Sequence, residues 1–236
     1  MEPTGTATTN FGEYKMKLLF NAFIKFALGA VMVGAMLFLP AWSFNYPGAW
    51  LFMGLLFVPM VALGVILLIK APGLLKKRLD LKEKQKGQKG VIALAGLIFP
   101  LGFVLSALDF RFGWSYVPTW ACVTASVLFL IGYALYAEVM RENEYLSRTV
   151  KVEENQRVIS TGLYRAVRHP MYLATCFMFL PLPLILGSLF GLIPFSLYLP
   201  LIIFRIVGEE RLLSAELCGY GEYKKRVRYR LIPFIW

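Results

Sequence analysis

Long apolar stretches separated by short polar segments form most of this chain. Four of them, at 18–39, 49–69, 91–108 and 116–137, have about the length that a helix needs to cross a bilayer, which is roughly 20 residues. Charged residues continue beyond the fourth stretch, so we expect that helix to extend into water.

The last apolar block, 171–207, is too long for one ordinary span. It is interrupted by helix-breaking residues at Pro181, Pro183, Gly187, Gly191 and Pro194. This pattern predicts a helical hairpin, or one straight and one broken helix, that returns to the side from which it started.

The pattern therefore predicts an all-α, polytopic membrane bundle of five to six membrane segments with a C-terminal helical hairpin. We divide the chain into a polar N-terminal tail (1–17), four spans (18–141) that include a basic loop (70–90), and a C-terminal region (142–236). No repeat that would indicate a solenoid is evident.

Composition agrees with a membrane protein, because 58% of the residues are hydrophobic and the mean hydropathy is +0.62. Soluble domains average roughly 45–50% apolar residues. The formal net charge is +11, but the basic residues flank the apolar stretches and form no separate domain. They favour contact with anionic membrane lipids over nucleic acid. The basic loop is read as a topogenic, lipid-touching loop, with a substrate site as the alternative.

The distribution of lysine and arginine predicts the orientation. If both termini, the basic loop and the segment 138–168 lie on one side, 24 of the 25 Lys and Arg residues are there, and Arg111 alone is outside. The positive-inside rule then places that side in the cytoplasm.

Metal and disulfide chemistry is not indicated. The three cysteines, Cys122, Cys176 and Cys218, are an odd number without a CxxC pair, and His169 is the only histidine. We expect no metal site.

Polar residues cluster on both sides of the final apolar block. Those before it are Gln156, Arg157, Tyr164, Arg168, His169 and Tyr172, and those after it are Arg205, Glu209 and Glu210. If the hairpin returns, the clusters meet at one depth. Arg205 and Glu209 share a helical face, where an arginine suits an anionic group and a glutamate a cationic one.

Each of these residues also has a structural interpretation. His169 can cap the helix that starts at Pro170, and the arginines can be topogenic charges. Glu209 and Glu210 can pair with nearby basic residues such as Arg211, and the tyrosines can be interface anchors. The expected meeting of the two clusters favours a site.

Several short motifs follow one another in the part of the chain from Thr149 to the end. They are Gly162, Leu163 and Tyr164; Arg168 to Tyr172; Arg205 with Glu209 and Glu210; Tyr220 to Val227; and a final Leu231, Ile232 and Pro233. In these motifs the chain resembles the isoprenylcysteine carboxyl methyltransferase family, and the related phospholipid N-methyltransferases share part of the pattern.

The resemblance implies an integral membrane enzyme that uses S-adenosylmethionine in a pocket at the cytosolic face, without a soluble Rossmann domain. It implies a cofactor site formed by Gln156, Arg157, Val158, Ile159, Tyr164, His169, Pro170, Met171, Tyr172 and Glu209. Arg205 would bind the substrate carboxylate, and Arg168 would lie near the reacting atoms. His169 or Glu210 would accept a proton if the acceptor were an amine or a thiol.

The expected acceptor is lipophilic and enters from the bilayer, with an isoprenylcysteine-type carboxylate as the first choice. The alternatives are a phospholipid amine or a small thiol. Membrane sterol reductases, which use NADPH, resemble the same C-terminal pattern. A transporter or a lipid-binding membrane protein is the non-enzymatic alternative, and the clustering of polar residues at one end of the spans is unlike a midplane transport path.

Overall fold

The computed structural model describes residues 5–79, 86–146, 152 and 154–236, and every regular element in these residues is helical. The elements are α1 (Gly5–Ala41), α2 (Pro47–Lys70), α3 (Pro72–Leu79), α4 (Lys86–Phe112), α5 (Thr119–Glu142), the 3-10 turn η1 (Gly162–Arg165), α6 (Pro170–Phe179), α7 (Leu182–Ile185), α8 (Leu192–Ser196), α9 (Tyr198–Glu216) and α10 (Tyr220–Arg226). Parts of the predicted basic loop and of the segment before η1 lie outside the described residues.

Within the described residues, five helical segments are long and apolar enough to cross a membrane. They are Met16–Ala41, Pro47–Lys70, Ala93–Phe112, Thr119–Glu142 and Leu192–Glu216, and a shorter apolar segment runs over Pro170–Ile185. The prediction of an all-α polytopic bundle is confirmed. The fourth span also continues through Arg141, as its charged end indicated.

The helix that carries the first span begins within the polar N-terminal segment. α1 starts at Gly5 and continues without a break into the membrane span, so the described part of that segment is helical. Residues with good helix propensity follow one another from Glu13 to Leu19, so the helix can extend N-terminally beyond its apolar part.

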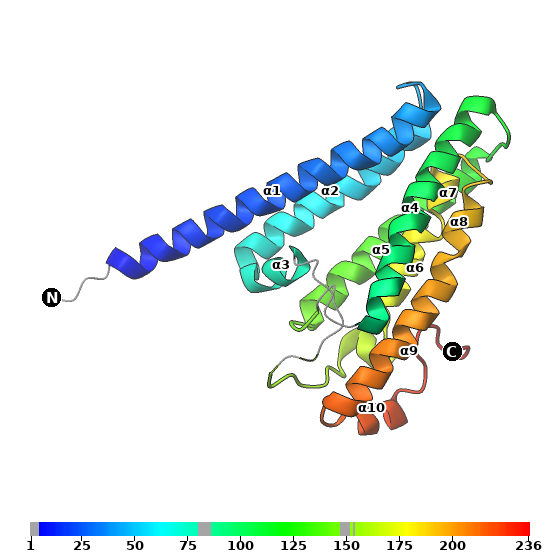
Figure 1. Cartoon of the computed structure of the whole chain (residues 1–236). Coiled ribbons are helices and arrows are strands. Elements are labelled where there is room, and N and C mark those ends of the chain that lie inside the picture. Colours follow the sequence, from blue (N-terminus) through cyan, green and yellow to red (C-terminus); the bar gives the residue numbers. More distant parts are fainter. Residues whose placement is uncertain (1–4, 80–85, 147–151, 153) are drawn as a thin grey trace.

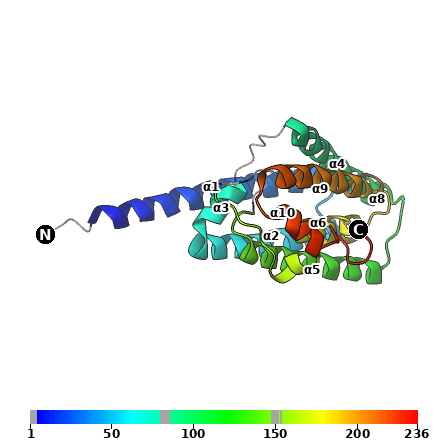
Figure 2. The ribbon, with the colours of Figure 1, turned by 90° about the horizontal axis from the view of Figure 1, so that it is seen from below.

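The helices form two associated groups (Figure 1). α1 and α2 lie side by side, while α4, α5, α6 and α9 run alongside one another, with α10 and the C-terminus at their lower end. In the view from below, α10 and the C-terminus lie between α5 and α9 (Figure 2). α10 and the C-terminal segment therefore lie together at one end of the bundle.

The hairpin is asymmetric. Its first arm is short and broken, with α6 followed by α7, and its second arm, α8 and α9, is a full-length span. Prolines at the starts of α6 and α7 are tolerated because the first turn of a helix needs no donor from them. The short arm explains why the sequence allowed either five or six membrane segments.

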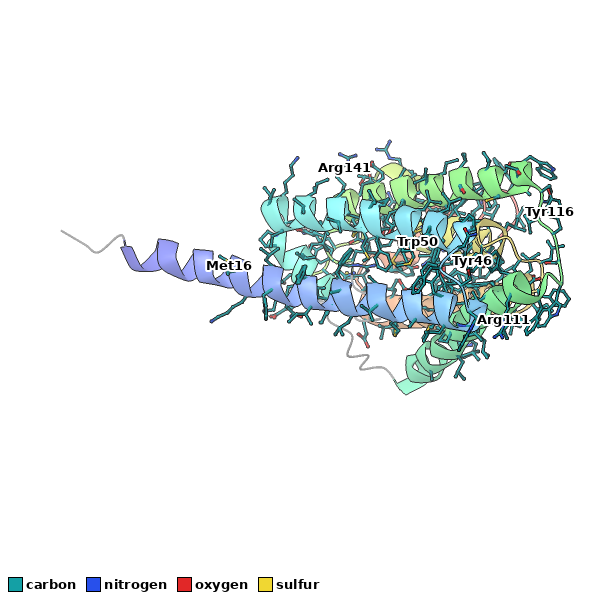
Figure 3. All side chains as sticks on the ribbon, turned by 90° about the horizontal axis from the view of Figure 1, so that it is seen from above. Met16, Tyr46, Trp50, Arg111, Tyr116 and Arg141 are labelled. Atoms are coloured by element: carbon teal, nitrogen blue, oxygen red, sulfur yellow. The ribbon has the colours of Figure 1, made fainter. Side chains whose placement is uncertain are left out.

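The tip of the hairpin is held by a buried carboxylate at the end of α4. Asp109 accepts hydrogen bonds from the hydroxyls of Ser115, at 2.6 Å, and Ser188, at 2.5 Å. Tyr46 donates to the carbonyl oxygen of Leu186 at 2.7 Å. Figure 3 shows Tyr46, Arg111 and Tyr116 toward this end of the bundle, away from Met16 and Arg141. Because buried polar groups need partners, this network fixes the tip.

Close packing of α5 against α6 sets the position of the short arm. A Cβ atom at Gly132 would lie 2.7 Å from Cγ of Met178 and 2.8 Å from the carbonyl oxygen of Ala174. Small residues permit such approach of helix backbones in membranes. Gly132 on α5 thus allows the close packing that positions α6, whose N-cap residue is His169.

We predict that Gly132→Ala destabilises the protein by about 1–3 kcal/mol, the usual cost of overpacking. Thermal and denaturant unfolding in detergent micelles would measure it. The control is Gly64→Ala in α2, where nothing lies within 4 Å of an added Cβ. That control should be neutral or slightly stabilising, because alanine is the better helix former. Equal stability of the two variants would contradict close α5–α6 packing.

Candidate functional site

The hairpin returns to the end of the bundle where it begins, and it brings residues from α9 against the residues that precede α6. Nε of Arg168 donates to Oε1 of Glu210 at 2.6 Å. Nε2 of His169 lies 3.3 Å from the same oxygen. The two polar clusters, more than 30 residues apart in the sequence, therefore meet.

A buried ion network lies at the base of the site. Glu210, Arg168 and His169 are 4%, 8% and 4% exposed. The second carboxylate oxygen of Glu210 accepts a hydrogen bond from Nε of Arg230 at 2.8 Å. Glu210 is thus held between two guanidinium groups and one imidazole, and a buried charge is tolerated only with such partners.

The C-terminal segment closes the base from the other side. The guanidinium of Arg168 donates to the carbonyl oxygens of Val227, at 2.7 Å, and Arg228, at 2.9 Å. The backbone N–H groups of Arg168 and His169 donate to the carbonyl oxygens of Tyr229 and Arg230, each at 2.9 Å. Five hydrogen bonds, including the one from Arg230 to Glu210, therefore bind the chain end to the residues before α6 and to α9.

Above this base, three side chains form a hydrogen-bonded row. Nε of Arg205 donates to the hydroxyl of Tyr172 at 2.9 Å, and that hydroxyl donates to Oε2 of Glu209 at 2.5 Å. Nδ1 of His169 is 4.0 Å from Oε1 of Glu209. Arg205 and Glu209 lie on one face of α9, as their i, i+4 spacing predicted, and Tyr172 from α6 lies between them.

The η1 turn forms another side of the site. Glu142, in the last turn of α5, accepts a hydrogen bond from the N–H of Leu163 at 3.1 Å. Gly162 has φ +43°, and any side chain there would collide with the Glu142 carboxylate. The hydroxyl of Tyr164 accepts a hydrogen bond from Nδ2 of Asn143 at 2.7 Å. Burial raises the pKa of Tyr164, so its hydroxyl stays protonated.

These parts surround a pocket. Its lining residues are Asn143, Tyr145, Leu146, Gln156, Arg157, Val158, Ile159, Tyr164, Arg168, His169, Pro170, Met171, Tyr172, Arg205, Glu209, Leu213, Leu217, Tyr220 and Tyr223. The empty space amounts to about 830 Å³, part of it open to solvent. The site is therefore an open trough.

All ten residues that the sequence comparison suggested for a cofactor site line this trough. Arg168 and Arg205 line it as well. Glu210 does not, because it lies behind the wall with its carboxylate engaged by Arg168, His169 and Arg230. The expectation that Glu210 could accept a proton from a substrate therefore has no support in this geometry, and the residue holds the wall in position.

The structural interpretations of these residues can now be compared with the contacts. His169 is the N-cap residue of α6, but its side chain makes no capping hydrogen bond. Tyr164 and Tyr172 are buried, with 8% and 4% exposure, so they are not interface anchors. Glu210 pairs with Arg168 and Arg230. The side chains are directed inward, to each other and to the trough.

Sequence reasoning missed some residues of the site. Arg230 and Asn143 had no pattern that set them apart from other polar residues near span ends. Tyr220 and Tyr223 belonged to a motif, but no role followed from it. Burial identifies them, with 3% and 2% exposure in a segment otherwise rich in exposed charge.

The chemistry of the lining suits a zwitterionic cofactor. Glu209 can hold a cationic amino group, and the arginines can hold an anionic one. Apolar side chains of Val158, Ile159 and Leu213 lie beside these charges and can contact a flat nucleoside. Among the described residues, no group of three His, Cys, Asp or Glu side chains could hold a metal ion.

Comparison with protein families gave one match of direct relevance. Residues 120–217 match the model of the phospholipid methyltransferase family. The match covers less than half of the chain, but it runs from α5 to the end of α9 and includes most of the trough. Comparison with the curated proteins returned no match. The family match confirms the predicted relation to membrane methyltransferases.

We predict that Glu210→Gln lowers the free energy of unfolding by about 3–5 kcal/mol, because it leaves Arg168 buried without its counter-ion. Unfolding in detergent, followed by tryptophan fluorescence, would measure the change. The matched control is Glu222→Gln on α10, whose carboxylate is exposed and pairs with Lys225. Exposed pairs contribute about 0–1 kcal/mol. A small effect at both positions would show that the buried network does not support the fold.

Proposed function

We propose that this membrane methyltransferase transfers a methyl group from S-adenosylmethionine to a lipophilic acceptor at the trough between α6 and α9. The observation that carries the proposal is the row formed by Arg205, Tyr172 and Glu209. It sets groups of opposite charge side by side in one pocket wall. Such a wall is suited to two ligands, one presenting a cationic group and one presenting an anionic group.

The cofactor side of the trough is assigned to Glu209, His169, Tyr164 and the segment 156–159. Glu209 is oriented by Tyr172 and would bind the amino group of the cofactor. The cofactor supplies a methyl group that is already activated by its sulfonium centre. The protein therefore mainly has to bind the two ligands, align them and exclude water, and it has little need to activate the methyl group.

The acceptor side is assigned to Arg205. Its guanidinium, held by the Tyr172 hydroxyl, would bind an anionic group next to the methyl donor. A carboxylate of the isoprenylcysteine type is the first candidate, because a carboxylate is a nucleophile that needs no base. This agrees with a site in which the carboxylate of Glu210 is already engaged by Arg168 and Arg230.

A phospholipid amine is the second candidate, and the match to the phospholipid methyltransferase family favours it. In that case Arg205 would hold the phosphate, and a protonated amine would have to lose a proton before it attacks. His169 lines the trough and would accept that proton. Glu210 is not placed to do so.

The proposed orientation puts the trough at the cytoplasmic face. The water-soluble cofactor would enter there, and the lipophilic acceptor would enter sideways from the bilayer. Basic residues on α3 and α10 lie toward the same end and would contact anionic lipid headgroups. Labelling of introduced cysteines from either side of intact membranes would test this orientation.

The decisive experiment incubates purified protein with radiolabelled S-adenosylmethionine and three acceptors: a prenylcysteine, phosphatidylethanolamine and a small thiol. We expect label in the prenylcysteine as a base-labile methyl ester. Label in the phospholipid headgroup would instead select the second candidate. No methyl transfer to any acceptor, together with binding of NADPH in preference to S-adenosylmethionine, would favour a reductase and overturn the proposal.

For Arg205→Ala we predict a loss of apparent acceptor affinity of about 10- to 150-fold, the value expected for a hydrogen bond to a charged group. Cofactor affinity should stay within a few-fold of the wild type. The control is Arg211→Ala, an exposed arginine farther along the same helix, which should change neither value. Equal losses of acceptor and cofactor affinity in Arg205→Ala would contradict the assigned role.

A further inference from the structure

The hydroxyl of Tyr220 is an unexplained polar group in the wall of the trough. The residue is 3% exposed, and within the described part of the chain its hydroxyl oxygen has no hydrogen-bond partner. A buried hydroxyl without a partner is costly, at about 1–3 kcal/mol. Native structures rarely keep such a group unless a ligand or a water completes it.

The position of Tyr220 is set by its surroundings and leaves the ring little freedom. Gly219 has φ +82°, a conformation that favours glycine, and it turns the chain from α9 into α10. The Tyr220 ring packs against Tyr223 with 5.8 Å between centroids, inside an apolar cluster that includes Leu217. The packing of the ring therefore fixes the position of the hydroxyl oxygen.

Tyr223, three residues later on the same helical face, provides a direct contrast. Its hydroxyl donates to the carbonyl oxygen of Tyr164 at 2.7 Å and so joins α10 to the η1 turn. Both tyrosines are buried and both line the trough. The Tyr223 hydroxyl supports the fold, whereas the Tyr220 hydroxyl has no hydrogen-bond partner in the described residues.

The nearby charged groups indicate what the hydroxyl would bind. Tyr220 is close enough to Glu210, Glu209 and Arg168 for their charges to act on it. Both carboxylate oxygens of Glu210 are engaged by arginine, and Oε2 of Glu209 is engaged by Tyr172. Burial raises the pKa of Tyr220, so the group keeps its proton and is available as a donor.

The sum of the charges around the trough favours an anionic partner for this donor. Around the trough there are four arginines (Arg157, Arg168, Arg205 and Arg230) and three glutamates (Glu142, Glu209 and Glu210), which leaves one formal positive charge without His169. An amino acid zwitterion has an ammonium group that suits Glu209. It also has a carboxylate, which needs a donor close by.

We propose that the Tyr220 hydroxyl donates a hydrogen bond to the carboxylate of the methionine part of the bound methyl donor. This inference rests on the proposed use of S-adenosylmethionine. It makes Tyr220 a binding residue that recognises the amino acid end of the cofactor, whereas Tyr223 holds the fold.

The test compares Tyr220→Phe with the wild type in detergent micelles, by calorimetric titration with two ligands. S-adenosylhomocysteine contains the amino acid part, and methylthioadenosine lacks it. Tyr220→Phe should bind S-adenosylhomocysteine about 10- to 100-fold more weakly, as for the loss of a hydrogen bond to a charged group. Its affinity for methylthioadenosine should stay within about twofold.

Thermal unfolding without ligand gives an independent readout. Tyr220→Phe should melt no lower than the wild type, because the hydroxyl that it removes has no hydrogen-bond partner among the described residues. Tyr223→Phe is the matched variant, and it should melt at a lower temperature because the Tyr164 carbonyl loses its donor. This opposite behaviour of two neighbouring tyrosines is not expected if both are merely structural.

Three results would overturn the inference. Unchanged affinity of Tyr220→Phe for S-adenosylhomocysteine, or an equal loss for both ligands, would remove the carboxylate as its partner. A lower melting temperature of the unliganded Tyr220→Phe protein would assign the hydroxyl a partner within the fold. If the wild type binds neither ligand, the proposed function itself fails, and the role of Tyr220 fails with it.

Discussion

The contact between Glu210 and the two arginines Arg168 and Arg230 is the interaction on which the functional end of this protein depends. A carboxylate that is 4% exposed is unfavourable by itself, since desolvation of a charge costs several kcal/mol. Each partner comes from a different part of the chain: the turn before α6, the middle of α9, and the C-terminal segment. The ion pairs between Glu210 and the two arginines join these three distant segments and form the base of the trough.

The hairpin is restrained at both ends, and this determines where the chemistry can occur. At its tip, Asp109 binds the hydroxyls of Ser115 and Ser188, and at its base Glu210 binds Arg168. Between them, Gly132 allows α6 to approach α5 closely. With both ends fixed, the row of Arg205, Tyr172 and Glu209 has a defined depth, and the wall proposed to bind a ligand is preformed.

The arrangement separates support from binding. Glu210 and Arg230 lie in or behind the base and hold other side chains, whereas Arg205, Glu209 and His169 line the trough. On α10, Tyr223 holds the η1 turn, whereas we propose that the Tyr220 hydroxyl binds the methyl donor. This separation also accords with methyl transfer, a reaction that depends mainly on alignment of two ligands and exclusion of water. A membrane location is reasonable for it when one of the two ligands is a lipid.

The sequence alone determined the class of protein and the order of the spans along the chain. The length of each apolar stretch decides whether it can cross the bilayer, and the flanking charges decide its orientation; both are local properties of the sequence. Motif resemblance also selected ten of the residues that line the trough, which lie before and on the two arms of the hairpin. It did not determine the structural role of Glu210, the participation of Arg230 and Asn143, or the contrast between Tyr220 and Tyr223. These depend on contacts between residues 20 to 60 positions apart, such as Arg168 with Val227 and Tyr164 with Tyr223. Such contacts exist only after the helices have packed, so only the tertiary structure decided which polar groups support the fold and which line the trough.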